Sequence, residues 1–243
     1  ATRRDAEAAQ LELAQANLNL TQTRLALTQA ELRALHAQIN PHFFFNTLIT
    51  IRYFERTNPE QARELLIKLS EIFQRSLSAG EFVPLRDELS YVEAYLALEK
   101  ARLDERLNIV WTNLANDYMD THVPTLVLQP LVENSVIHGI SQQPDGGTLH
   151  IVINRVADDL LLQLDDDGVG FDVAKVMAGR AEGSVMREMV AEKRPSIGLR
   201  NVDERLRMLY GDDYRLHIES TPGKGTRIVF KVPLKQEEPI ATD

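Results

Sequence analysis

Cysteine is absent from this chain of 243 residues, which excludes disulfide bonds and thiolate-bound metal ions. Apolar runs stay well short of the roughly 20 residues that a membrane-spanning helix needs, and no signal peptide is present. Basic residues are in the minority, 27 against 36 acidic ones, and the net charge is −9. This balance argues against direct nucleic acid binding, because such binding needs clustered Lys and Arg against phosphates. The hydrophobic fraction of 44% is typical of a globular protein with a core.

Methionine is missing from the first position, and the chain runs from Ala1 through Arg3 and Arg4 directly into a helical pattern. We therefore expect a fragment whose upstream part includes a membrane anchor, because basic residues flank such anchors on the cytoplasmic side. Any membrane attachment would then be made only through that upstream segment.

Proline and glycine are also missing from residues 1–40, which are rich in Ala, Leu, Gln and Glu. This composition predicts one long helix. Apolar residues repeat every seven positions along it, a spacing that favours a parallel, dimeric coiled coil. The repeat consists of Leu11, Leu18, Leu25, Leu32 and Ile39. We assign residues 1–31 to a signalling coiled-coil helix.

The least usual stretch follows this helix and reads Asn40-Pro41-His42-Phe43-Phe44-Phe45-Asn46. Three adjacent phenylalanines sweep most of a helix circumference, so at least one must face solvent or a partner. Pro41 cannot donate a backbone hydrogen bond, which predicts a kink just before His42. A lone histidine on an apolar helix face is more often a core residue than a functional one. His42 therefore needs support from the rest of the chain.

Two further helices are predicted downstream. Asn58-Pro59 marks a turn, and apolar residues at helical spacing then extend from Glu60 to Ser78. Another helix follows Pro84, from Leu85 to Leu103. We assign residues 32–82 to a helical hairpin for dimerisation, which would form a four-helix bundle in a homodimer. Residues 83–106 form a connecting helix.

From residue 107 the pattern changes to a mixture of strands and helices. Strands are predicted at 108–114, 148–155, 160–165, 214–220 and 225–232, and helices at 124–139 and 198–210. Residues 172–196 read as a long loop with one short helix, and residues 236–243 as a tail. The mixture lacks a regular alternation of strand and helix, so we predict an α+β sandwich over residues 107–235.

Four short motifs in this part could carry chemistry. Asn134 and His138 lie four residues apart on a predicted helix, and an amide oxygen is a ligand suited to Mg²⁺. Asp166-Asp167-Gly168-Val169-Gly170 follows a strand, where a carboxylate could accept from an adenine amino group. Gly198-Leu199-Arg200-Asn201 opens a helix, whose free N–H groups attract phosphate. Gly223-Lys224-Gly225-Thr226 forms a turn. Each motif alone is weak, because such sequences usually form ordinary loops and surface positions.

In this order and spacing the four motifs resemble the N, G1 and G2 boxes of the GHKL (Bergerat) ATP-binding fold of histidine kinases, gyrase, Hsp90 and MutL. Hydrolysing members carry a glutamate one turn before the magnesium asparagine, whereas this chain has Pro130 there. ATP is therefore expected to serve as a phosphoryl donor. The Asn-x-x-x-His-Gly pattern also looks like the anti-sigma-factor kinases, but those lack an upstream hairpin with Asn-Pro-His-Phe.

The segments 41–46, 83–89 and 95–99 are similar to the LytS-type sensor histidine kinases, a resemblance that covers roughly residues 32–234. Phe44 replaces the leucine usual in that family, and Arg194-Pro195-Ser196 lacks its usual glycine. The resemblance implies a cytoplasmic portion of a membrane-anchored bacterial sensor that binds ATP and Mg²⁺, with Asn134 as the metal ligand. It assigns nucleotide binding to Asn134, His138, Asp166, Gly168, Gly170, Gly198, Leu199, Asn201, Gly223, Gly225 and Thr226.

By the same resemblance, His42 accepts the γ-phosphoryl group and passes it to an aspartate of a response-regulator receiver domain, with LytTR-type regulators as candidates. The residue that takes the imidazole proton is open, and Glu133 is one candidate. Asn46 lies one helical turn after His42, where it would position water for a phosphatase reaction or simply fix the dimer register. A second hypothesis is a non-catalytic scaffold that binds its regulator through the bundle when nucleotide is present.

Overall fold

The structure is a computed structural model and describes residues 41–78, 80–178 and 195–234. The predicted coiled coil of residues 1–31, the kink before Pro41 and the predicted tail of residues 236–243 lie outside these ranges. The chain divides into two units, residues 1–46 and 47–243. In the described ranges, no helix combines the length and the apolar character that crossing a bilayer requires.

A capping residue separates the first two described helices, α2 (Pro41–Thr57) and α3 (Pro59–Ser78). The Asn58 side-chain oxygen accepts the backbone N–H of Gln61 at 3.3 Å, and its amide donates to the Gln61 side chain at 3.2 Å. The first of these bonds satisfies one backbone N–H of the helix start, the second holds the Asn58 amide in place, and Pro59 suits a first position that needs no N–H. The predicted helix break at Asn58-Pro59 is confirmed.

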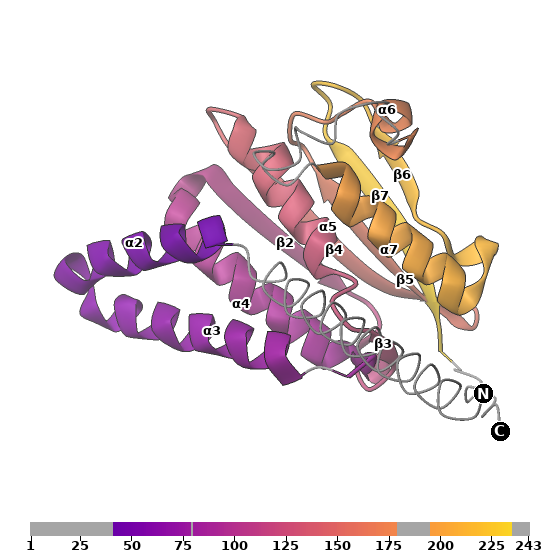
Figure 1. The fold of residues 1–243 in the computed structure, drawn as a ribbon, viewed down its shortest axis with the longest axis horizontal. Coiled ribbons are helices and arrows are strands. Elements are labelled where there is room, and N and C mark those ends of the chain that lie inside the picture. Colours follow the sequence, from indigo (N-terminus) through magenta and orange to yellow (C-terminus); the bar gives the residue numbers. More distant parts are fainter. Residues whose placement is uncertain (1–40, 79, 179–194, 235–243) are drawn as a thin grey trace, which may run out of the picture. The chain divides into compact units, whose positions relative to one another are not determined.

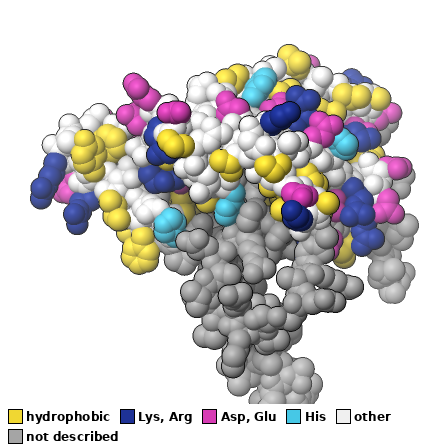
Figure 2. All heavy atoms as spheres, turned by 90° about the horizontal axis from the view of Figure 1, so that it is seen from above, with side chains coloured by type: hydrophobic (Ala, Val, Ile, Leu, Met, Phe, Trp, Pro, Cys, Tyr) yellow, Lys and Arg dark blue, Asp and Glu magenta, His cyan; other side chains and the backbone are white. Residues whose placement is uncertain are grey.

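Helix α3 packs against α4 (Leu85–Leu103), whose bounds agree with the prediction. The buried face of α3 is a helical stripe of Ala62, Leu65, Leu69 and Ile72. Other large apolar side chains of the two hairpin helices stay exposed, and Figure 2 shows hydrophobic side chains at the surface on its left. They include Ile49, which is 65% exposed, Tyr53, Leu66 and Ile67. One apolar face of the hairpin is therefore covered by α4, and a second apolar face is exposed to solvent.

A five-stranded mixed sheet forms the core of the remaining chain, in the order β2-β4-β5-β7-β6. Only the β2–β4 pair is parallel. The strands are β2 (Leu107–Asn113), β4 (Gly147–Val156), β5 (Asp159–Asp166), β6 (His217–Ser220) and β7 (Thr226–Pro233). Every second residue of β5 is buried, as expected for a sheet with one covered face.

Two helical segments lie side by side across that covered face, α5 (Gln129–Glu133) and α7 (Pro195–Tyr210) (Figure 1). Most leucines and valines of α5 and α7 are buried, and so are the inner residues of β4, β5 and β7. This packing makes the α+β sandwich that the sequence predicted. The sequence's single tryptophan, Trp111, lies on the edge strand β2 and is 36% exposed.

A second, two-stranded sheet joins β1 (Phe82–Pro84) to β3 (His122–Pro124). The predicted helix over 124–139 therefore begins too early. Pro124 belongs to β3 and pairs with Phe82 of β1, and the helix begins at Gln129. Strand β6 is likewise shorter than predicted, and α7 begins at Pro195 rather than Gly198. Short helices complete the described chain: α6 (Val173–Ala178) and the 3₁₀ turns Asp104–Arg106, Asn116–Tyr118, Ile140–Gln142 and Asp212–Tyr214.

Candidate functional site

The helix that carries Asn134 changes its winding at that residue. Residues Asn134–Gly139 form a π-helix directly after α5. Wider turns of this kind are rare and often occur at functional sites. Asn134 is buried, and its Oδ1 atom accepts no hydrogen bond from any described residue. A buried amide oxygen without a donor is suited to a cation, because an unsatisfied buried acceptor is otherwise unfavourable.

Asp166 lies at the end of β5, against the last residue of this π-helix. A Cβ atom built on Gly139 would lie 2.9 Å from Oδ1 of Asp166, and one built on Gly168 would lie 2.5 Å from the carbonyl carbon of Gly139. The Gly168 N–H donates to Asp166 Oδ1 at 3.1 Å. The position of Gly168 therefore requires glycine, whereas a side chain at Gly139 would displace the Asp166 carboxylate. The structure brings the asparagine helix and the Asp-x-Gly turn into backbone contact.

The carboxyl group of Asp166 is poised between its two protonation states. Burial raises its pKa to about 6, an effect that the nearby Ser135 hydroxyl and the Gly168 N–H partly offset. Its Oδ2 atom accepts no hydrogen bond from the described residues. An external N–H donor would satisfy this oxygen and favour the charged form. An exocyclic adenine amino group is a donor of that kind.

The glycine turn that follows β5 and the glycine turn between β6 and β7 also contact each other through backbone atoms. The Gly223 N–H donates to the Val169 carbonyl at 2.6 Å. Gly170 and Gly225 both have positive φ angles, 59° and 84°. A Cβ atom on Gly225 would lie 2.0 Å from the carbonyl oxygen of Asp166, so no side chain fits there. Gly225 therefore lies against the Asp166 backbone, and Gly170 and Gly223 belong to the two turns that contact each other beside it.

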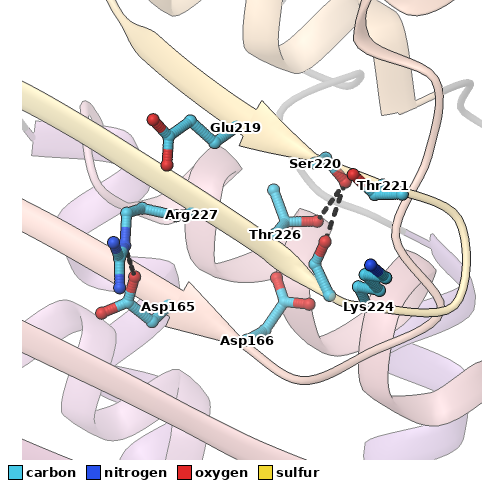
Figure 3. A pocket seen from close by; sticks show the side chains of 9 residues that line it. Asp165, Asp166, Glu219, Ser220, Thr221, Lys224, Thr226 and Arg227 are labelled. Atoms are coloured by element: carbon cyan, nitrogen blue, oxygen red, sulfur yellow. Dashed lines mark hydrogen bonds and ion pairs between the residues drawn. The ribbon is translucent and has the colours of Figure 1, made fainter.

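Ser220 ties the end of β6 to this cluster. Its hydroxyl donates to the Gly225 carbonyl at 3.0 Å, lies 3.0 Å from the Thr226 hydroxyl and accepts the Phe171 N–H at 2.9 Å. Ser220, Gly225 and Thr226 line a hollow of about 280 Å³, together with Lys224 and Asp166 (Figure 3). Thr226 is paired with Asp166 across β5 and β7.

Gly198, Leu199 and Asn201 lie in the first two turns of α7. Gly198 lies within the first four residues of that helix, whose backbone N–H groups have no partner inside it. A Cβ atom on Gly198 would lie 3.5 Å from Pro130 of α5, so the two helix starts are close. Leu199 is fully buried, whereas Asn201 is exposed. Leu199 therefore anchors this helix start to the core.

The other two predicted residues on the asparagine helix are less clearly placed in a site. Glu133 is partly exposed, and its Oε1 atom accepts the Gln129 side-chain amide at 2.6 Å. His138 is partly exposed one residue before Gly139. The prediction that Asn134 and His138 share a face assumed α-helical winding, and the π-helix alters that relation.

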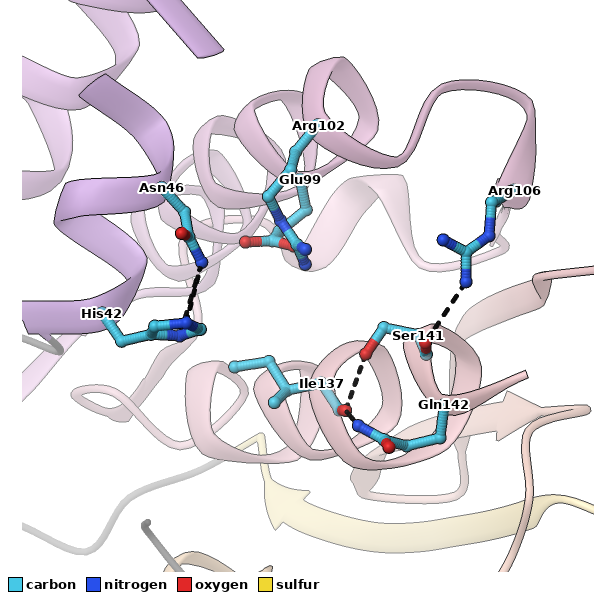
Figure 4. A network of polar contacts seen from close by, with 8 residues as sticks. All are labelled: His42, Asn46, Glu99, Arg102, Arg106, Ile137, Ser141 and Gln142. Carbon is cyan, nitrogen blue, oxygen red and sulfur yellow. Dashed lines mark hydrogen bonds and ion pairs between the residues drawn. The ribbon is translucent and has the colours of Figure 1, made fainter. Parts of the chain in front are cut away.

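His42 and Asn46 are in contact on α2. The Asn46 side-chain nitrogen lies 3.2 Å from Nε2 of His42 and 3.4 Å from Nδ1 (Figure 4). His42 is exposed. Because the amide nitrogen is nearly equidistant from both ring nitrogens, the Asn46 side chain lies over the imidazole ring and restricts how that ring can turn. The predicted sharing of one helix face is confirmed.

Sequence comparisons agree with both parts. Residues 30–107 match the histidine kinase family, and residues 119–236 match the family of histidine kinase-, DNA gyrase B- and HSP90-like ATPases. The sensor histidine kinase BtsS of Escherichia coli is 37% identical over 208 residues, and the sensor protein LytS of Oceanobacillus iheyensis is 36% identical over 207. The chain belongs to the LytS-type histidine kinase family. Each alignment covers 84% of this chain and 34% of the relative.

A third member of the LytS-type family is named as both kinase and phosphatase. This sensor histidine kinase/phosphatase LytS of Staphylococcus aureus is 36% identical over 211 residues, 85% of this chain and 35% of that protein. The chain thus spans about a third of the length of the curated relatives it matches. The ATPase match places an ATP-binding domain on the sheet and its covering helices.

Two contributors to the site were missed by reasoning from the sequence. Ser135 is buried beside Asp166, and Ser220 bridges the turns that follow β5 and β6. Serine is common in turns and at the ends of elements, so neither position stood out. Ser135 follows Asn134 directly, and that adjacency was the only available signal.

Proposed function

We propose that this chain is the kinase portion of a two-component sensor, which transfers the γ-phosphoryl group of ATP to His42 and from there to an aspartate of a response regulator. The observation that carries the proposal is the backbone clasp of Gly139, Gly168, Val169 and Gly223 around the carboxylate of Asp166. Such a clasp leaves one buried acceptor, Asp166 Oδ2, without a hydrogen-bond donor among the described residues. The exposed His42 on α2 supplies a nucleophile.

The residues present fit ATP together with Mg²⁺. Asp166 Oδ2 is the candidate acceptor for the adenine amino group, and Asn134 Oδ1 is the candidate ligand for the metal. Mg²⁺ would neutralise charge on the phosphate oxygens. The free N–H groups at the start of α7, with Gly198 among them, suit phosphate, and the Asn201 side chain is a further proposed contact of the nucleotide. His138, Gly170, Leu199, Gly223, Gly225 and Thr226 remain proposed members of the nucleotide site.

Phosphoryl transfer to His42 uses a lone pair on one ring nitrogen. The N–P bond forms as the P–O bond to the β-phosphate breaks, and the electron pair of that bond leaves with ADP. Asn46 contacts the ring and so restricts its orientation. Glu133 is the proposed acceptor of the imidazole proton. Asn46 is also a candidate for positioning water in a phosphatase step.

The exposed apolar face of the hairpin supports a homodimer as the working form. Phe45, Ile49 and Tyr53 are each more than 60% exposed and follow one another at helical spacing on α2. Burying such a stripe against a second copy would complete a four-helix bundle. We propose a response-regulator receiver domain as the partner of that bundle, and a membrane anchor in the full-length protein.

The test is incubation with Mg²⁺ and γ-labelled ATP, with His42→Gln in parallel and His217→Gln as a matched control on β6. Label that requires His42, survives alkali and is lost in acid establishes phosphohistidine. Unlabelled protein that still binds ATP would instead support the scaffold hypothesis. Transfer of the label to a purified receiver domain then tests the second step.

A further inference from the structure

The turn of residues 125–128, directly before α5, is held in an unfavourable backbone conformation. Leu126 has a φ angle of 57°, in the left-handed region that leucine rarely adopts. Leu128 caps the start of α5 without any side-chain hydrogen bond of its own. Residues held in this way persist only when their surroundings enforce the conformation.

Glu88 of α4 supplies that enforcement. One carboxylate oxygen accepts the Leu126 N–H at 2.9 Å, and the other accepts the Leu128 N–H at 2.9 Å. Glu88 is 2% exposed, and among the ion pairs of the described residues none includes it. A buried carboxylate is costly, so its two backbone bonds must offset that cost.

Two acceptor atoms are needed at this position. A carboxylate offers one oxygen to each N–H group, whereas a glutamine of the same shape offers one oxygen and one NH₂ group. The NH₂ group would face a backbone N–H, and two donors would then oppose each other. The geometry therefore requires glutamate and not a side chain that is only similar in size.

Arg205 of α7 holds the same turn from the other side. Its guanidinium donates to the Thr125 carbonyl at 2.5 Å and to the Glu81 carbonyl at 2.9 Å. The Thr125 N–H donates to that same Glu81 carbonyl at 3.0 Å, and the Thr125 hydroxyl donates to the Gly80 carbonyl at 2.5 Å. The turn is thus bonded to α4, to α7 and to the segment that follows α3.

We propose that Glu88 is a positioning residue for the metal site: by clamping residues 125–128 it sets the start of α5 and hence the place of the Asn134 amide oxygen. Arg205 ties this clamp to α7 and to the end of the hairpin. The proposal rests on the proposed function, in which Asn134 binds Mg²⁺. It adds that the metal arm of the site depends directly on α4 through the start of α5, whereas Asp166 contacts that helical segment only at its other end, at Gly139.

The variant Glu88→Gln tests the clamp, with Glu93→Gln, an exposed position of the same helix, as the matched control. Amide hydrogen exchange of residues 125–128, measured without nucleotide, should speed up about tenfold in Glu88→Gln, equivalent to about 1.4 kcal/mol. ATP affinity with Mg²⁺ should fall about tenfold by the same conversion. ADP affinity in EDTA should change less than about twofold.

Unchanged exchange at residues 125–128, or equal losses of affinity with and without Mg²⁺, would overturn the proposal. If the wild-type protein bound ATP equally well with and without Mg²⁺, the metal role of Asn134 would be rejected. The exchange measurement would still decide whether Glu88 holds the turn of residues 125–128. Arg205→Met gives a second variant in case Glu88→Gln fails to fold. It should also speed exchange at Thr125 and leave ADP affinity in EDTA unchanged.

Discussion

The nucleotide-binding sheet and the helical hairpin differ in how completely their groups are packed within one chain. Around Asp166 the glycines approach so closely that added Cβ atoms would collide with backbone, and the turns bond to each other within one chain. The hairpin instead leaves large apolar side chains such as Ile49 and Tyr53 exposed. The first region is held together by contacts within one chain, whereas the second leaves an apolar face uncovered in a single copy.

This difference indicates where each region can be disturbed. A site made of backbone contacts tolerates almost no added volume, because neither partner can move aside. A helical face that awaits a partner tolerates substitution in the monomer and responds only in the assembled state. Variants in the two regions should therefore separate nucleotide binding from dimerisation.

Gly168→Ala should have the largest effect, because its Cβ atom would lie 2.5 Å from backbone carbon of Gly139. We expect loss of measurable ATP binding and destabilisation of about 2–4 kcal/mol, within the range for severe steric or strain effects. Gly80→Ala is the control, since its Cβ atom would meet only the Phe82 carbonyl at 3.8 Å. Calorimetric titration and thermal unfolding measure both quantities. Retained binding in Gly168→Ala would contradict the backbone clasp.

Asp166→Asn should lower ATP affinity about a hundredfold, or about 2.7 kcal/mol, and yet stabilise the folded protein. Because the pKa is raised from 3.8 to about 6, this group favours the folded state at low pH, and that contribution is lost as pH rises through 6. The difference corresponds to roughly 3 kcal/mol above pH 6. Denaturant unfolding at pH 5 and 7.5 should show a smaller pH dependence in the variant. Lower stability of the variant at pH 7.5 would count against burial as the cause.

Ile49→Glu should weaken dimerisation at least about tenfold, or about 1.4 kcal/mol, because it places a charge in the proposed apolar seam. Nucleotide affinity should stay as in the wild type. The control is Met208→Glu, which changes an 81% exposed side chain on α7. Sedimentation equilibrium at several concentrations measures the association. Equal dimerisation constants for Ile49→Glu and Met208→Glu would show that the dimer interface does not include this face of α2.

Asn58→Ala should have the smallest effect, because it removes only the cap of α3. Loss of such a cap costs about 1 kcal/mol. We expect a lower free energy of unfolding by that amount, with ATP affinity unchanged. Gln61→Ala removes only the bond between the Asn58 and Gln61 side chains and keeps the backbone cap. The free energy of unfolding of this variant should lie between those of the wild type and Asn58→Ala. A change in ATP affinity in either variant would show that the hairpin and the nucleotide site are coupled.

Local sequence signals predicted much of the fold. Pro84 and Asn58-Pro59 marked helix starts because proline has a local backbone preference that tertiary contacts rarely override. Strands β4 and β5 were predicted within one residue, since Ala157-Asp158 separates two alternating apolar patterns. Strand β3 was missed because its pairing with β1 joins residues 82–84 to 122–124, a contact that no local pattern reveals.

The candidate site was predictable in its residues and not in its contacts. Asp166 and Gly168 stood out through motif order, but nothing in the spacing indicated that Gly168 lies against Gly139. The π-helix at Asn134 was also missed, because α- and π-winding place the same demands on residue type over one turn. Glu88 read as an ordinary helix residue, since its two hydrogen bonds reach residues about 40 positions away.

Trp111 gives the molecule one optical reporter, and its position decides what that reporter measures. The only indole of the sequence lies on strand β2, so its emission follows the sheet, whereas far-ultraviolet circular dichroism sums every helix. Coincident denaturation curves from the two signals would mean that hairpin and sheet unfold as one cooperative body. Ellipticity lost before the emission shifts would mean that the helices melt from a sheet that stays folded.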